Sequence, residues 1–190
     1  MSYATLDELK AFLNVDLTDT TDDANLQIAL DAVNELIDDF CGRTFVVPTG
    51  PATQRTYTAA SPRAVFIDDA VTISAVENPA GTMWDDLNFY AEPVNGPAKG
   101  EPYEEIYALD TTWDRTKPNS VLVTATWGWP ATPKKVKQAT LLQASRMFNR
   151  KNSPFGIAGS PETGSELRLL ARLDPDVEQL LAPLRRLVVE

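Results

Sequence analysis

The sequence predicts an α+β fold in which an antiparallel bundle of four helices carries a β-rich insertion between its second and third helices. Three observations predict it. Two segments with helical periodicity open the chain, at residues 5–15 and 22–41. A long stretch at residues 45–129 is rich in β-branched, aromatic and turn residues. A helix that starts with proline, at residues 133–150, and a short helix after Asp174 then close the chain.

The 190 residues predict one domain of ordinary size, spanning residues 1–190, with enough chain to bury a core. We expect residues 1–42 and 133–190 to form its helical core, residues 43–132 the β-rich insertion, and residues 152–165 a flexible loop. No apolar run approaches the length of a membrane span, and the N-terminus lacks the basic and apolar blocks of a signal peptide. We therefore expect no association with membranes.

The first two helices carry clear start and stop signals. Thr5 and Glu8 have the spacing of a capping box, in which each side chain bonds the other residue's backbone N–H. Thr21 is placed to cap the second helix, and Gly42 stands where a left-handed residue ends it. The second helix has an apolar seam made of Leu26, Leu30, Val33, Ile37 and Phe40. Such a seam predicts packing against other helices.

The middle of the chain predicts strands separated by turns. The expected strands are residues 53–59, 64–67, 71–77, 87–91, 105–109 and 121–127. All four tryptophans fall in this region, at Trp84, Trp113, Trp127 and Trp129. Interleaved aromatic rings can stack on bases or sugars, but few basic residues accompany them here, which favours core or subunit contacts.

The C-terminal part is basic and contains a loop of unusual composition. The third helix is rich in lysine and arginine. These residues either form a solvated face or dock on an acidic partner. Residues 152–165 hold three glycines, two prolines and three serines, with Phe155 and Ile157 among them. A loop of this length in a compact domain is usually functional or disordered.

Composition argues against an enzyme. The chain has no histidine, so the commonest general base and metal ligand is missing, and a single cysteine, Cys41, excludes an internal disulfide or a cysteine-rich zinc site. Asp38–Asp39, Asp68–Asp69 and Asp85–Asp86 are adjacent pairs, whose side chains diverge on helices and strands alike. They are expected to be solvated surface charges, and no catalytic residue, cofactor or metal is predicted.

Charge is distributed unevenly along the chain. Residues 1–42 hold ten acids and one lysine, residues 43–132 hold eleven acids and six bases, and residues 133–190 hold six acids and ten bases. The net charge of −10 argues against tight binding of duplex DNA, which needs many phosphate-neutralising cations. The acidic and basic ends are either solvated separately or meet, within one chain or between neighbours.

Four short segments, in this order and spacing, carry a resemblance. They are residues 3–10 (YATLDELK), 40–45 (FCGRTF), 133–139 (PKKVKQA) with Arg150 at the helix end, and 174–185 (DPDVEQLLAPLR). Together they resemble the tailed-phage head-tail connector (adaptor) proteins, the small ring proteins that dock beneath the portal.

The resemblance implies a structural protein of the virion, located in the neck between capsid and tail and present in the host cytoplasm during assembly. It implies a ring of identical subunits, twelve by family analogy, that binds the portal protein and receives the next neck protein, a stopper or tail terminator. Genomic DNA would pass through the ring during ejection without sequence-specific binding. An acidic protein suits a channel in which DNA slides.

Partner-binding residues are expected at the C-terminal end, because the resemblance suggests that this end of an adaptor grips the portal. The candidates are Phe155, Ile157, Arg168, Arg172, Arg185 and Arg186. The apolar stripe of the last helix, made of Val177, Leu180, Leu181 and Leu184, has two possible uses. It either docks on a partner or packs on the helices of its own chain.

One function of a different class stays open. The tryptophan-rich middle of the chain also fits a β-rich ligand- or sugar-binding module with helical flanks, as a virion accessory or tail protein. Association with a portal would distinguish the adaptor from this alternative.

Overall fold

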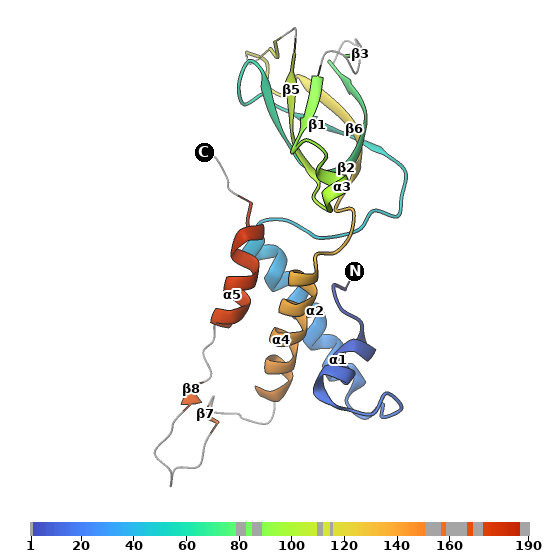
Figure 1. Cartoon of the computed structure of the whole chain (residues 1–190), viewed down its shortest axis with the longest axis vertical. Helices are drawn as coiled ribbons and strands as arrows, with labels where there is room; N and C mark the ends of the chain where they lie inside the picture. The colour runs from blue at the N-terminus through green and yellow to red at the C-terminus, as the bar shows by residue number, and fades with distance from the viewer. Residues whose placement is uncertain are drawn as a thin grey trace. The chain divides into compact units, whose positions relative to one another are not determined.

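The computed structural model describes residues 2–78, 83–84, 89–109, 112–114, 116–150, 157–158, 167–168 and 173–186. The chain forms two compact units (Figure 1). The helical unit contains residues Met1–Thr44 and Pro133–Glu190, and the sheet unit contains residues Phe45–Thr132. The prediction of a single domain over residues 1–190 stays a prediction.

The helical unit contains two long helices and two short ones. Its helices are α1 (Leu6–Leu13), α2 (Asp23–Cys41), α4 (Lys134–Arg150) and α5 (Pro175–Leu181), and α5 continues into the 3-10 helix η2 (Ala182–Leu184). The two-residue strands β7 (Ile157–Ala158) and β8 (Leu167–Arg168) pair with each other. Contacts join α2 to α4 most extensively, and α4 also contacts α1 and α5.

Helix ends follow the local signals of the sequence. The Thr5 hydroxyl accepts from the Glu8 backbone N–H at 3.2 Å, and the Glu8 carboxylate accepts from the Thr5 backbone N–H at 3.0 Å, so the predicted capping box is present. Gly42 ends α2 in the left-handed conformation, as predicted, with a φ of 64°. Asp22, rather than Thr21, is the first flanking residue of α2, and its side chain makes no capping bond.

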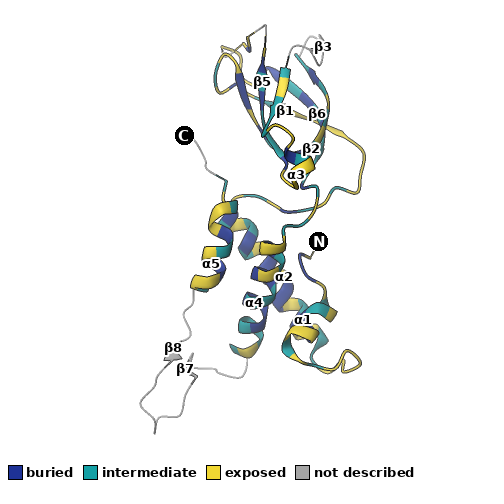
Figure 2. Cartoon of the chain, in the orientation of Figure 1, coloured by how far each residue is buried: buried dark blue, intermediate teal, exposed yellow. Residues whose placement is uncertain are grey.

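The apolar seam of α2 forms the core of the helical unit. Leu30, Val33 and Ile37 are fully buried, and so are Val136 of α4 and Val177 of α5 (Figure 2). Burial of a side chain of this size is worth roughly 1.5–3 kcal/mol. The seam therefore supplies most of the stability of α2, which isolated helices of this length lack.

The sheet unit is built on an antiparallel sheet with five strands in the order β1-β6-β2-β5-β4, and β3 also pairs with β2 (Figure 1). The strands are β1 (Thr53–Tyr57), β2 (Ala64–Glu77), β3 (Met83–Trp84), β4 (Phe89–Glu92), β5 (Tyr103–Ala108) and β6 (Val121–Trp127), with the short helix α3 (Gly96–Lys99) before β5. The two strands expected at residues 64–67 and 71–77 are one long strand, β2, whose register shifts at bulges. One face of the sheet buries a core of its own, with Val65, Ile106 and Val123 at zero exposure.

The sheet unit begins and ends at one place. The Trp129 backbone N–H donates to the Val46 carbonyl at 2.8 Å, and the ring of Trp129 packs against that of Phe45 with centroids 5.0 Å apart. The Thr132 hydroxyl also donates to the Phe45 carbonyl at 3.3 Å. This contact fixes the entry and the exit of the sheet unit beside each other.

The predicted fold class, an antiparallel four-helix bundle with a β-rich insertion, is wrong. The structure has a five-strand antiparallel sheet with helices. A four-helix bundle needs helices of matched length, but α1 and α5 have 8 and 7 residues, about 12 and 10 Å, against 19 residues and about 28 Å for α2. The sheet also has its own buried core, so it does not depend on a bundle for one.

We predict that Gly128→Ala destabilises the protein by about 1–3 kcal/mol or more, whereas Gly50→Ala is nearly neutral. Gly128 has a φ of 136°, and a Cβ there would lie 2.3 Å from the Val46 carbonyl oxygen, in the contact that joins the two ends of the sheet unit. No atom lies within 4 Å of a Cβ at Gly50. Chemical denaturation followed by tryptophan fluorescence measures the free energy of unfolding of both variants. Equal stability of the two variants would contradict the need for glycine at position 128.

Candidate interaction surfaces

The structure places part of the predicted partner-binding set. Arg185 and Arg186 lie just after η2, and Ile157 of β7 pairs in register with Arg168 of β8. Phe155 and Arg172 lie outside the described residues, as does most of the predicted loop 152–165. The role of all six residues in partner binding stays a prediction.

Arg185 and Arg186 both contact the end of α2. The guanidinium of Arg185 lies 5.0 Å from the centre of the Phe40 ring, a cation–π distance. The backbone N–H of Arg186 donates to the Cys41 carbonyl at 2.8 Å. These contacts attach the chain after η2 to the C-terminal end of α2, and the charged side chain of Arg185 is exposed.

The stripe of the last helix packs on its own chain. Val177 and Leu181 have zero exposure, and Leu180 and Leu184 are half-buried. Asp174 caps α5 through its side chain, which accepts from the Asp176 backbone N–H at 2.9 Å, and it forms an ion pair with Arg146 of α4. Of the two uses that the sequence left open, the structure places the buried residues of α5 in the core of the helical unit.

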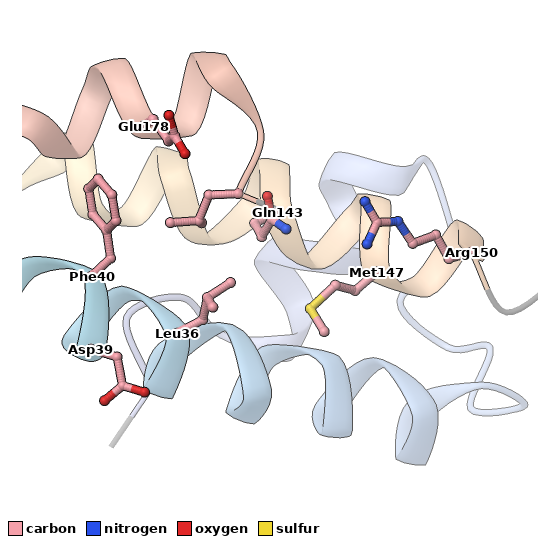
Figure 3. A pocket seen from close by; sticks show the side chains of 8 residues that line it. Leu36, Asp39, Phe40, Gln143, Met147, Arg150 and Glu178 are labelled. Atoms are coloured by element: carbon pink, nitrogen blue, oxygen red, sulfur yellow. The ribbon is translucent and has the colours of Figure 1, made fainter. Parts of the chain in front are cut away.

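A partly open apolar groove of about 490 Å³ lies between α2, α4 and α5. Leu36 and Phe40 project into it from α2 and Met147 from α4 (Figure 3), and Leu173 also lines it. Asp39 and Arg150 are among its polar lining residues. The groove is large enough for one or two apolar side chains, and nothing in its lining converges as catalytic groups do.

Buried Cys41 is chemically inert at neutral pH. It is 1% exposed at the end of α2, and burial, followed by the nearby Asp38 carboxyl, raises the pKa of its thiol to about 11. The reactive thiolate form is therefore scarce. Within the part of the chain that is described, no group of three or more His, Cys, Asp or Glu side chains could hold a metal ion.

The loop between α1 and α2 is organised around a buried lysine. Lys10 is 2% exposed, its ammonium donates to the Asp19 carbonyl at 2.8 Å, and it forms an ion pair with Asp23 at 2.5 Å. Sequence analysis missed this role, because a lone lysine in an acidic segment gives no sign that it folds inward. Its contacts hold a loop in which Leu17 is 55% exposed, and Ile28 of the following helix α2 is 67% exposed.

Three tryptophans of the sheet unit, Trp113, Trp127 and Trp129, make contacts within the unit. Trp113 and Trp129 are 5% and 3% exposed, and the Trp129 indole N–H donates to the Asp69 carboxylate at 2.8 Å. Trp127 carries the guanidinium of Arg55 4.6 Å from its ring centre, and that guanidinium donates to Asp68 at 2.7 Å. The rings of Trp113, Trp127 and Trp129 are therefore buried or covered, unlike the open rings of sugar-binding sites, which weighs against the ligand-binding alternative.

The outer face of the sheet carries aromatic residues that sequence analysis missed. Tyr90 of β4 and Tyr107 of β5 are direct cross-strand partners, and their rings stack with centroids 5.3 Å apart and planes 13° apart. Phe66 of β2 lies opposite Glu105 of β5, and Glu105 lies opposite Glu92 of β4. Because opposite residues share a face and alternate residues return to it, all of these point away from the core.

We call this set the aromatic sheet face. It consists of Phe66, Tyr90, Tyr107 and Leu109 with the carboxylates Glu92 and Glu105. Phe66, Tyr90 and Leu109 are 47%, 39% and 43% exposed. A hydrogen bond with Glu105, more than burial, raises the pKa of the Tyr107 hydroxyl, so that hydroxyl stays protonated at neutral pH. Alternation within β4 and β5 hinted at an outer face, but only the register brings the aromatic residues together.

Among the described helices, none combines the length and the apolar character that a membrane span needs.

The described residues form three surfaces that could bind a partner: the apolar groove, the exposed loop between α1 and α2, and the aromatic sheet face. All three suit protein recognition, because they combine apolar or aromatic residues with carboxylates and carry no converging catalytic or metal-binding groups in the described residues.

Comparison with known proteins finds similarity to a family of phage proteins and to chains of phage-like particles. Residues 3–73, from before α1 into β2, match the model of the phage gp6-like head-tail connector protein family. The resemblance to head-tail connectors predicted from the sequence is confirmed by this match. No curated protein matches the chain by sequence.

Solved structures share the fold over nearly the whole chain. A chain of the neck of a native gene transfer agent (GTA) particle, computed with C12 symmetry, is 16% identical with a TM-score of 0.50, over 97% of this chain and 91% of that one. A chain of the neck of an empty GTA particle, computed with C6 symmetry, is 16% identical with a TM-score of 0.54, over 97% and 90%. A chain of the native GTA virion is 18% identical with a TM-score of 0.54, again over 97% and 90%.

We predict that truncation after Leu173 strongly destabilises the helical unit. Val177 and Leu181 together contribute roughly 3–6 kcal/mol of burial, a large share of the roughly 5–15 kcal/mol that holds a protein folded. Arg185→Ala, which removes only an exposed cation–π contact, should cost about 0.5–1 kcal/mol. Circular dichroism melting compares the two. An unchanged melting curve for the truncated protein would mean that the stripe is available for docking.

Proposed function

We propose that this protein is a structural head-to-tail adaptor of a tailed phage or phage-like particle and lies in the neck of the virion. The observation that carries the proposal is the family match over residues 3–73, which covers elements of both units. The shared fold with neck chains over 97% of the chain supports the same location.

In the proposed assembly, identical subunits form a closed ring beneath the portal protein, and the ring extends the channel through which the genome is ejected. Twelve subunits are the expected number, and the C12 symmetry with which one similar neck was computed supports it. The other face of the ring receives the next neck protein. The net charge of −10 supports a channel wall that repels DNA phosphates rather than retaining them.

The proposed role is structural rather than enzymatic. Its support is the surfaces that the described residues form, since they offer apolar and aromatic contacts, together with the family match. The sugar-binding alternative has no comparable support, because Trp113 and Trp129 are buried and Arg55 covers Trp127.

We predict that the purified protein binds the portal protein of its own particle and forms a ring of twelve subunits on it. Native mass spectrometry of the mixture gives the subunit number, and electron microscopy of labelled particles gives the location. The portal alone and an unrelated acidic protein of similar size serve as controls. Tailed particles that contain no copy of this protein would refute the proposal.

The loop at residues 152–165 is proposed to take part in neck assembly. Replacement of residues 154–164 by a Gly/Ser linker of equal length should leave the melting temperature nearly unchanged and reduce incorporation into necks, because Phe155 and Ile157 would be lost as contacts to a neighbour. A matched variant keeps these two residues within the linker and should recover incorporation. Normal yield of tailed particles with the first variant would contradict the proposal.

A further inference from the structure

We propose that the aromatic sheet face binds the first turn of α4 of a neighbouring copy, with Lys134 and Lys135 as the residues that it recognises. The inference rests on the proposed function, since it names the contact between subunits of the ring. It commits to one partner, a second copy of this chain, and the following observations support that choice.

The aromatic sheet face is not needed for the core of its own unit. Val65 and Ile106, which alternate with its residues along β2 and β5, are fully buried and point to the opposite face of the sheet. Phe66 and Leu109 remain 47% and 43% exposed. Large aromatic and apolar residues that adjoin one another on one open face are typical of surfaces that bind another protein.

The chemistry of the face selects a cationic partner. Stacked tyrosine rings attract cations to their faces, and the carboxylates of Glu92 and Glu105 lie opposite each other on neighbouring strands. The six residues of the face include no lysine or arginine, and residues 43–132 as a whole carry eleven acids against six bases. A lysine can lay its apolar stem over a ring while its ammonium reaches a carboxylate.

The start of α4 has the complementary chemistry. Lys134 and Lys135 are exposed, and no acidic residue lies in the first turn of α4. Lysine at the positive end of a helix dipole is unfavourable for the helix itself. Lys137, one turn further, differs, because it forms an ion pair with Glu8 of α1. Lys134 and Lys135 thus bring positive charge to a position where local helix stability disfavours it, and an acidic partner surface supplies a reason.

The spacing of the two sets agrees. The Cα atoms of successive residues such as Lys134 and Lys135 are about 3.8 Å apart. Directly opposed strand residues such as Glu92 and Glu105 have side chains that start about 5 Å apart. Adjacent helical side chains diverge, but the long stems of the two lysines let their ammonium groups reach the two carboxylates from either side, with Tyr90 and Tyr107 beside them.

Such a contact joins two different surfaces and is heterologous. Each copy offers one sheet face and one α4 start, so every copy can bind two neighbours, and repetition of the contact closes a ring when the rotation fits. The apolar groove of the helical unit, by contrast, offers charges of both signs, Asp39 and Arg150, and selects no partner by charge.

The test uses charge reversal in full-length protein. The face variant carries Glu92→Lys and Glu105→Lys, and the helix variant carries Lys134→Glu and Lys135→Glu. Each variant alone should associate about tenfold or more weakly than the parent, because like charges then meet. An equimolar mixture should restore association, since each face then meets a helix of opposite charge. Sedimentation velocity and ring formation on the portal provide the two readouts.

Controls separate the alternatives. Lys99→Glu with Glu101→Lys changes exposed charges elsewhere in the sheet unit and should have no effect. If the contact lies within one chain, a variant with all four reversals recovers and the mixture does not, which overturns the proposal. If the face binds another virion protein, reversal at Lys134 and Lys135 leaves association unchanged, which also overturns it.

A spin label separates this inference from the proposed function. The label is attached at Gln138→Cys, an exposed position one turn after Lys135 on α4, in a copy without isotopes, with Cys41→Ala to leave one thiol. It should broaden the amide signals of Tyr90 and Tyr107 in an isotope-labelled copy at high concentration. Broadening at these residues in a protein that particles lack would refute the proposed function alone. Particles that contain the ring, without broadening and without rescue in the mixture, would refute the inference alone.

Discussion

Burial of the apolar seam of α2 is the constraint on which the rest of the structure depends. Leu30, Val33 and Ile37 are buried mainly when the chain returns to α2, because α4, the helix that contacts α2 most, follows the whole sheet unit in the sequence. Closing a loop of roughly ninety residues costs on the order of 4 kcal/mol in chain entropy. Burial of these three side chains, at roughly 1.5–3 kcal/mol each, offsets that cost.

The entropy cost of bringing α4 back to α2 is lower because the two ends of the sheet unit are held beside each other. Trp129, Val46 and Phe45 hold the exit beside the entry, so once the sheet has formed, α2 and α4 are brought close without a further search. Gly128 permits the close approach, because only a residue without a Cβ fits against the Val46 carbonyl. One local backbone requirement in the sheet unit thereby supports the pairing of helices in the helical unit.

Features set by local chemistry were predictable from the sequence, whereas those set by pairing were not. The capping box of Thr5 and Glu8, the left-handed Gly42 and the Asp174 cap depend on residues within one turn, and all three are present. The predicted fold class was wrong because periodicity reveals that strands exist but not that they pair into one five-strand sheet with a core of its own. The aromatic sheet face was missed because Tyr90 and Tyr107 become neighbours only through the register of β4 and β5.

Some cations of the basic C-terminal segment form ion pairs within their own chain, whereas others remain exposed to solvent. Lys137 pairs with Glu8, and Arg146 pairs with Asp174, so part of the basic C-terminal segment neutralises acids of its own chain. Such partly exposed pairs contribute about 1 kcal/mol each, and Lys134 and Lys135 remain as the cations that α4 presents to solvent at its start.

The net charge of the protein affects how two copies approach each other. Copies with a net charge of −10 repel one another at long range, and salt screens that repulsion beyond about 8–10 Å. Assembly of the proposed ring then depends on short-range complementarity, which the proposed contact of the lysine pair with tyrosines and carboxylates supplies and a purely apolar patch does not. In the proposed ring, this general repulsion favours the orientations that bring Lys134 and Lys135 of one copy to carboxylates of the next.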